Sequence, residues 1–214
     1  MQASGACGVP GIRYVGPAEM QLEDHYAELS KFCEDGGTQR LAISGRAGPV
    51  VRAIGGTQRI PDTLQSIWSR AQQLLGLESE KLFQISVNHY RDASALMVPH
   101  KDGRGQLGLV FSFGRGMSTL KFFHRPLDSS ATYTRVFDPP SADEVVHSYL
   151  LEPGSCLLVR GEAFTDWVHY VEKSDFDSVT ESLANFGQLA PSTLKLGRVT
   201  RQSRVSVVMW PAGK

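Results

Sequence analysis

The chain has 214 residues, 41% of them hydrophobic and 21% charged, which are ordinary values for a folded protein and exclude a disordered tail. Lys and Arg total 22 and Asp and Glu total 22, so the net charge is 0. This balance excludes a globally basic nucleic-acid binder but leaves room for a local basic patch.

The lack of targeting segments and the cysteine pattern both predict an intracellular protein. No apolar run approaches the roughly 18 residues of a membrane span, and the N-terminal segment lacks the pattern of a signal peptide. The three cysteines are far apart and odd in number, which argues against a disulfide framework or a cysteine-based zinc site. We therefore expect an intracellular protein of the cytoplasm or nucleus, without membrane contact.

The first third of the chain predicts two helices. Residues 1–11 are rich in small side chains and are expected to be flexible. Apolar residues recur on one side between Pro17 and Phe32, and again between Pro61 and Gly76, at helical spacing. The intervening residues 36–60 are expected to form short strands or loops with a basic face, from Arg40, Arg46, Arg52 and Arg59.

Short β-type segments dominate after Glu80, separated by turn residues. They cover 83–90, 107–113, 118–124, 148–153, 155–160, 164–171 and 204–210. Many short strands with turns between them indicate a sandwich or barrel, so the fold class is mainly β with flanking helices. Residues 125–147 and 172–200 are polar and are expected to be long surface loops.

Two histidines and one aspartate are candidate metal ligands. His100 and Asp102 are two positions apart, so on an extended chain both side chains project to the same side. The third candidate is His169, which would share a strand face with Thr165 and Trp167. This ligand set is the facial triad of non-haem iron oxygenases, although zinc uses the same residues, so a zinc-binding module stays open.

The last β-type segment, RVSVVMW, carries a candidate anion site. With a period of two, Arg204, Ser206, Val208 and Trp210 face one way. An arginine on an apolar inner wall is costly unless it meets an anion, which a dicarboxylate would supply. Asn88 and Tyr90 share a strand face and could add hydrogen bonds, whereas His89 between them should point away.

Taken in order, these motifs carry a resemblance to a known family. The pattern N-x-Y, P-H-x-D-G, L-L-V-x-G-x-A-F-T, a distal His and R-x-S resembles the AlkB family of Fe(II)- and 2-oxoglutarate-dependent dioxygenases. PHKDG, LLEPGSCLLVRGEAFT and RVSVV are most similar to the eukaryotic AlkB homologue 6 subgroup, and the similarity covers about residues 12–210.

The resemblance implies a fold and a set of binding residues. It implies one domain over 12–214, with an N-terminal extension of helices and a substrate lid over 12–80 and a double-stranded β-helix (jelly-roll) core over 81–214. The helices would pack outside that core. The family pattern assigns Fe(II) to His100, Asp102 and His169, and 2-oxoglutarate to Asn88, Tyr90 and Arg204.

This sequence departs from the family pattern at one position expected near the substrate. The family has a second arginine six positions after the one that binds the co-substrate, but this chain has Trp210 there. The candidate substrate-pocket residues are Trp167, Trp210 and Arg52, with residues 36–60 in the place of a lid over a nucleotide.

The implied reaction is oxidative demethylation of an alkylated nucleic-acid base, with release of succinate and CO2. A base within a duplex would have to be flipped out, and binding to nucleic acid would be modest and salt-sensitive. Two alternatives stay open: an oxygenase acting on a protein or small molecule, and a catalytically silent metal-binding jelly roll. The sequence predicts no particular oligomeric state.

Overall fold

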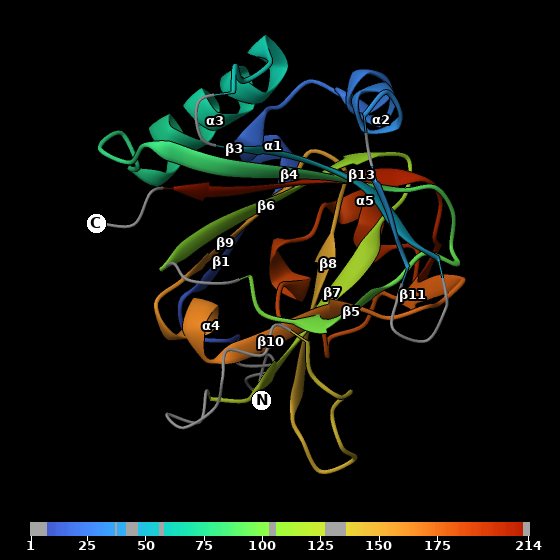
Figure 1. Ribbon diagram of the computed structural model, residues 1–214. Helices are drawn as coiled ribbons and strands as arrows, with labels where there is room; N and C mark the ends of the chain where they lie inside the picture. Colours follow the sequence, from blue (N-terminus) through green and yellow to red (C-terminus); the bar gives the residue numbers. More distant parts are fainter. Residues whose placement is uncertain are drawn as a thin grey trace.

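Two antiparallel sheets stand face to face in the computed structural model, which describes residues 8–36, 38–41, 47–55, 58–102, 106–126 and 136–211 (Figure 1). The larger sheet has the order β1-β9-β6-β13-β4-β3-β2 and the smaller sheet the order β5-β10-β7-β8. This arrangement confirms the prediction of a mainly β, jelly-roll fold with flanking helices.

The strands of the larger sheet are β1 (Ile12–Val15), β2 (Thr38–Leu41), β3 (Ala47–Gly55), β4 (Leu82–Tyr90), β6 (Leu107–Gly114), β9 (Cys156–Arg160) and β13 (Arg204–Pro211). Those of the smaller sheet are β5 (Met97–His100), β7 (Ser118–His124), β8 (Val146–Leu151) and β10 (Trp167–Val171). A separate pair consists of β11 (Phe176–Ser178) and β12 (Arg198–Thr200). The part of the chain before residue 81 thus adds three strands to the larger sheet as well as helices.

Helices cover the outer face of the larger sheet. Figure 1 shows α1 (Pro17–Met20), α2 (Tyr26–Glu34) and α3 (Asp62–Leu75) on that side, away from the smaller sheet. Their apolar residues form one core with the outward side chains of β4 and β13. The predicted second helix is confirmed: α3 follows Pro61 and ends at Gly76, whose φ of 69° suits a left-handed cap. No described helix has the length and apolarity required to cross a bilayer.

The predicted helix from Pro17 to Phe32 is wrong as a continuous element. The chain leaves α1 at Gln21, which has a left-handed φ of 51°, and enters α2 only at Tyr26. The Asp24 carboxylate accepts a hydrogen bond from the Tyr26 amide at 3.1 Å, which supports the new helix start. Local side-chain bonding therefore divides a pattern that periodicity alone joins.

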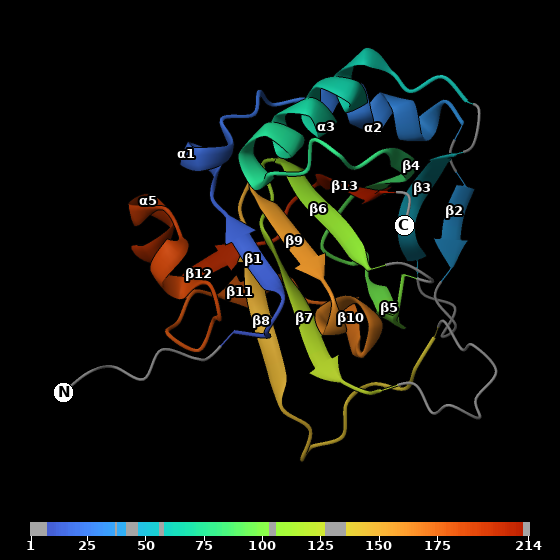
Figure 2. The same ribbon diagram turned by 90° about the vertical axis from the view of Figure 1, so that its left-hand side faces the viewer.

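Residues 172–200 are not the polar surface loop that the composition predicts. They form β11, β12, a short 3-10 helix η1 (Phe186–Gln188) and α5 (Pro191–Leu194), seen beside β8 in Figure 2. Their buried apolar residues are Val179, Leu183, Leu189 and Val199. The buried Asn185 side chain bonds both the amide and the carbonyl of Leu150, at 3.0 and 2.8 Å, so this segment covers the edge strand β8.

Two other expectations change in detail. The segment 164–171 is not one strand, because α4 (Glu162–Thr165) precedes β10, so Thr165 does not share a strand face with His169. Residues 1–7 of the expected flexible terminus lie outside the described residues. Val9, by contrast, is 2% exposed, and its amide donates to the Tyr149 hydroxyl at 2.9 Å. Of the expected loop 125–147, residues 127–135 also lie outside the described part.

Candidate functional site

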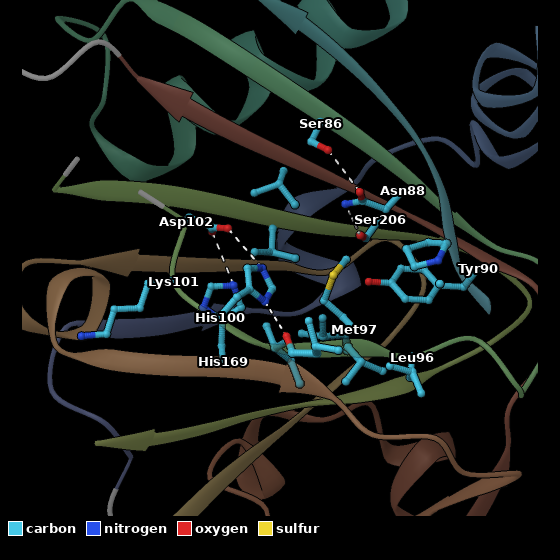
Figure 3. A pocket seen from close by; sticks show the side chains of 18 of the residues that line it. Ser86, Asn88, Tyr90, Leu96, Met97, His100, Lys101, Asp102, His169 and Ser206 are labelled. Atoms are coloured by element: carbon cyan, nitrogen blue, oxygen red, sulfur yellow. Dashed lines mark hydrogen bonds and ion pairs between the residues drawn. The ribbon is translucent and has the colours of Figure 1, made fainter. Parts of the chain in front are cut away.

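A cavity of about 660 Å³ opens between the two sheets. Its lining includes the inward side chains of β4 and β13 on one side, and residues of β5 and β10 on the other. All six residues expected to bind metal or co-substrate line it: Asn88, Tyr90, His100, Asp102, His169 and Arg204. Strands far apart in sequence therefore place the candidate metal ligands and the candidate co-substrate ligands in the same cavity (Figure 3).

The candidate metal ligands converge at one point of this cavity. His100 ends β5 and His169 lies on β10, where the two residues are direct partners in the antiparallel pairing. The Asp102 carboxylate faces both rings, with one oxygen 3.5 Å from His100 Nε2 and the other 3.5 Å from His169 Nε2 (Figure 3). One potential ligand atom from each residue lies within 4.8 Å of the others, so a single ion could contact all three.

The protonation of the triad suits a cation. His100 Nδ1 lies 2.7 Å from the Val98 carbonyl and must donate to it, which points Nε2 toward Asp102. Burial lowers the pKa of His169, favouring the neutral imidazole. Burial also raises the pKa of Asp102, but the two neighbouring imidazoles outweigh it and hold that pKa well below its ordinary value. Neutral imidazole and ionised carboxylate are the forms that bind metal.

Lys101 fixes the short segment between the first two candidate ligands. Its side chain is 3% exposed and points away from the triad (Figure 3). The ammonium donates to the main-chain carbonyls of Arg125 at 2.7 Å and Thr165 at 2.8 Å. The first carbonyl follows β7 and the second precedes β10, so one side chain ties the His100–Asp102 segment to the ends of both strands.

A buried arginine marks the opposite part of the cavity. Arg204 is 3% exposed, its guanidinium carbon lies 4.1 Å from the centroid of the Tyr90 ring, and its Nη1 has no hydrogen-bond partner among the described residues. Burial lowers the pKa of Arg204 and raises the pKa of Tyr90. An unpaired buried guanidinium is costly, so its orphaned donor fits an anion entering the cavity.

Polar neighbours complete this anion site. Asn88 donates to the Ser206 hydroxyl at 3.3 Å and accepts from Ser86 at 3.1 Å. Apolar residues that line the same cavity include Leu120, Leu151 and Val171. An arginine with amide and hydroxyl groups, in a pocket with apolar walls, suits a dicarboxylate with an aliphatic middle. The residues present therefore fit both a divalent metal and 2-oxoglutarate.

Two predicted substrate-pocket residues lie elsewhere, which corrects that part of the prediction. Arg52 and Ala53 alternate on β3, and only Ala53 lines the cavity. The Arg52 guanidinium lies 3.9 Å from the Phe32 ring centroid and donates to the Phe32 carbonyl at 3.0 Å, on the helical side. Trp167 packs between His124 and His147, with ring centroids 5.3 Å away in each case.

The remaining substrate and lid predictions have mixed outcomes. Trp210 does line the cavity, beside Val208 and Ser206 as the alternation predicts. Arg59 is exposed and lies 3.6 Å from Asp62, outside the cavity lining. The side chains of Arg40 and Arg46, which belong to the expected basic lid, lie outside the described residues.

Three residues that contribute to the site are not among the residues predicted from the sequence. Lys101 carries no motif signal beyond its place between His100 and Asp102. Gln84 lines the cavity because it lies six positions before Tyr90 on the same strand face, a signal that strand alternation could have supplied. Arg201 forms a buried two-pronged ion pair with Asp177 at 2.6 and 2.8 Å and holds the chain just before β13. Its partner comes from β11, which no local pattern predicts.

Comparison with known proteins supports the fold. No protein-family model matches the chain. The structure of OsALKBH1 matches with a TM-score of 0.54 and 16% identity, over 95% of this chain and 99% of that one. A Trichoplax adhaerens prolyl hydroxylase, in complex with a hypoxia inducible factor oxygen degradation domain peptide fragment, matches with a TM-score of 0.50 and 11% identity, over 94% and 83%. The chain therefore shares its fold with these two proteins.

Proposed function

We propose that the chain is an Fe(II)- and 2-oxoglutarate-dependent dioxygenase. The observation that carries this proposal is the pairing, in one cavity, of a three-residue ligand set with a buried arginine whose Nη1 has no hydrogen-bond partner among the described residues. A structural metal site would close its coordination shell with a fourth protein ligand, whereas three ligands leave positions for co-substrate and oxygen. Membership of the AlkB family, and of its homologue 6 subgroup, is part of the same proposal and rests on the motif pattern.

The chain's own groups have separate tasks in this reaction. When bound, Fe(II) with 2-oxoglutarate and dioxygen supplies the oxidation of a substrate C–H bond, with succinate and CO2 as co-products. His100, Asp102 and His169 hold the metal, and Arg204 forms a forked ion pair with the far carboxylate of the co-substrate. Tyr90 and Asn88 donate hydrogen bonds that orient it, and the apolar walls keep water away from its middle.

For the substrate, we favour an alkylated nucleic-acid base that is demethylated after flipping out of its stack. The motif resemblance supports this choice. A protein substrate is the second candidate. The similarity to a prolyl hydroxylase in complex with a peptide fragment supports it, as does the position of Arg52 and Arg59 away from the cavity.

Two buried thiols agree with the intracellular location that belongs to this proposal. Cys33 and Cys156 are both buried and unpaired, and burial raises the pKa of Cys33 to about 11. Such thiols are protonated and unreactive at neutral pH, which suits a reducing compartment such as the cytoplasm or nucleus.

The substitution His100→Ala tests the metal assignment. We expect it to abolish binding of Fe(II), measured anaerobically, and the slow formation of succinate that occurs without a primary substrate. His124→Ala is the matched control, because His124 lies on β7 of the same sheet, is exposed and is not among the residues that line the cavity. Succinate formation by His100→Ala at the rate of the unmodified chain would contradict the assignment. If the unmodified chain bound metal but gave no Fe(II)–2-oxoglutarate absorption band, a catalytically silent metal-binding module would be favoured instead.

A further inference from the structure

Arg201, three residues before Arg204, bonds one segment of chain through all three nitrogens of its guanidinium. Nε and Nη2 donate to the two oxygens of the Asp177 carboxylate at 2.6 and 2.8 Å. Nη1 donates to the main-chain carbonyl of Glu172, and the Arg201 amide donates to the Asp175 carbonyl at 2.9 Å. The side chains of Arg201 and Asp177 are 5% and 6% exposed. Buried bonds therefore join the chain just before β13 to the segment that follows β10.

The two strands that meet at this ion pair each carry a candidate ligand. The carbonyl that accepts from Arg201 Nη1 lies three residues after His169, and Arg204 lies three residues after Arg201. Because β10 belongs to the smaller sheet and β13 to the larger one, these bonds connect the two sheets that enclose the cavity. In addition, β11, which carries Asp177, contacts β7 of the smaller sheet.

The ion pair also lies at the end of the cavity that holds Arg204. Arg201 and Arg204 bound one small space together with Tyr90 and Val171. Val171 lines the main cavity as well, two residues after His169 on the same strand. At roughly 3.3 Å per residue, the inner face of β10 therefore covers about 7 Å from the candidate metal site toward Arg204.

A buried ion pair of this kind fixes geometry more than it adds stability. Removing two charges from water costs about as much free energy as their attraction returns. Either partner alone would be an uncompensated buried charge, so the pair resists any movement that separates Arg201 from Asp177. The two-pronged contact also fixes the relative orientation of the two groups. The sheets are thus held together where Arg204 enters the cavity.

Resting on the proposed function, we infer that Arg201 is a positioning residue that sets the length of the dicarboxylate accepted between the metal ligands and Arg204. A co-substrate that places its 2-oxo acid group at the metal must place its far carboxylate at Arg204. The distance between these two places depends on how far β13 stands from β10, which the bonds of Arg201 fix. In a pocket of fixed length, one methylene group changes affinity by about 10- to 200-fold.

Three 2-oxo dicarboxylates test this inference: oxaloacetate, 2-oxoglutarate and 2-oxoadipate, each one methylene longer than the one before. Their dissociation constants are measured by titration calorimetry under anaerobic conditions on the protein loaded with Mn(II). We expect the unmodified chain to bind 2-oxoglutarate at least about ten-fold more tightly than either of the other two acids. Equal binding of all three acids would overturn the inference alone, whereas no binding of 2-oxoglutarate would overturn the proposed function and the inference with it.

Arg201→Met removes the side-chain bonds and so lets β13 move away from β10. We expect 2-oxoglutarate and oxaloacetate to weaken about three- to ten-fold and 2-oxoadipate not to weaken, so the preference for 2-oxoglutarate over 2-oxoadipate narrows by at least about three-fold. A purely structural loss would weaken all three acids alike, and that result would overturn the inference.

Arg70→Met is the matched control. Arg70 also donates to main-chain carbonyls, those of Glu19 at 3.1 Å and Met20 at 2.8 Å, but it does so between α3 and α1 on the helical side of the larger sheet. This variant should keep the preferences of the unmodified chain. A narrowing as large as that of Arg201→Met would overturn the inference.

A double variant covers the loss of stability expected from the single one. Arg201→Met leaves the Asp177 carboxylate buried without its counter-ion, which is strongly destabilising. Arg201→Met combined with Asp177→Leu removes both charges, and replacing a buried ion pair by apolar residues is often neutral for stability. We expect the same narrowing of the preference over 2-oxoadipate. A folded double variant with the preference of the unmodified chain would overturn the inference.

Discussion

The two faces of the strand pair β4 and β13 differ although alternate residues of the same two strands form both. The outer face, beneath α2 and α3, is buried and apolar: Ile85, Val87, Val205, Val207 and Met209. The inner face, one residue out of step, carries buried polar groups that include Asn88, Tyr90, Arg204 and Ser206. These four inner-face residues are 3–5% exposed, nearly as buried as the outer-face residues, but their side chains are polar.

This difference separates stability from binding. Apolar burial on the outer face contributes to the free energy of unfolding at roughly 25 cal/mol per Å². A polar group buried without a partner, such as Arg204 Nη1, reduces that free energy until a ligand satisfies it. Substitutions on the outer face should therefore change stability, and substitutions on the inner face should change ligand affinity.

The largest effect is expected from Arg204→Met on the inner face. Because this change removes the cation that meets the co-substrate, the dissociation constant for 2-oxoglutarate should rise by about two to three orders of magnitude. The melting temperature should stay the same or rise, since an unpaired buried charge is lost. Calorimetric titration and a thermal melt measure the two quantities. Arg198→Met, an exposed arginine over Phe176, is the control; equal 2-oxoglutarate affinity in both variants would refute the assignment.

Met209→Ala on the outer face should give the reverse result. Met209 is 0% exposed in the core beneath the helices, so the variant should lose about 2–4 kcal/mol of unfolding free energy. Its affinity for 2-oxoglutarate should change by less than about three-fold, because the inner face keeps its side chains. Urea denaturation followed by the same titration checks both. A large loss of affinity in the folded variant would show that the two faces are coupled.

Lys101→Met tests a polar group outside both faces. The substitution keeps the side-chain length but removes the hydrogen bonds to the carbonyls of Arg125 and Thr165. Since those bonds position the His100–Asp102 segment, we expect metal affinity to fall about ten-fold, with a loss of about 1–2 kcal/mol in the metal-free protein. Co(II) titration and denaturation measure these effects. Loss of stability with unchanged Co(II) affinity would mean that Lys101 supports the fold alone.

The smallest effect is expected from the pH response of His89, an outer-face neighbour of Tyr90. Burial lowers the pKa of His89 below its ordinary value of 6.5, although Glu34 opposes the shift. The unfolded chain then takes up a proton near pH 6.5 that the folded chain does not, so stability is full above this pH and falls as the pH decreases.

His89→Gln should flatten this response. The reduction in slope is at most about 1.4 kcal/mol per pH unit, measured by denaturation between pH 5 and 7. The charged and hydroxyl groups facing the ring are Glu34, Arg91, Tyr26 and Ser203, and the substitution leaves them in place. An identical pH slope in both proteins would show that His89 titrates equally in the folded and unfolded chains.

Local patterns predicted much of this architecture. The helix between Pro61 and Gly76 needed only apolar periodicity and its end signals, and the alternation along 204–210 already separated Arg204 from Met209. The same alternation placed Asn88 and Tyr90 on the inner face and His89 on the other. These features succeed because neighbouring residues determine them.

The failures share a different origin. Periodicity joined α1 and α2 because it does not register the left-handed Gln21. Composition suggested a loose loop over 172–200, where Asn185 and buried apolar residues attach the segment to β8. The basic segment 36–60 suggested Arg52 as a pocket residue, but the face that Arg52 occupies depends on the pairing of β3 with β4, where it stands opposite Val87 of the outer face.

By itself, the sequence determined which side chains lie two residues apart on one strand: His100 with Asp102, and Arg204 with Ser206. Such spacing follows from the geometry of an extended backbone and needs no partner. Tertiary structure alone decided that His169 pairs with His100 across β5 and β10, and that Gln84 stands opposite Trp210. Strand pairing and register come from contacts between distant segments, and the free energy of those contacts belongs to the whole folded chain.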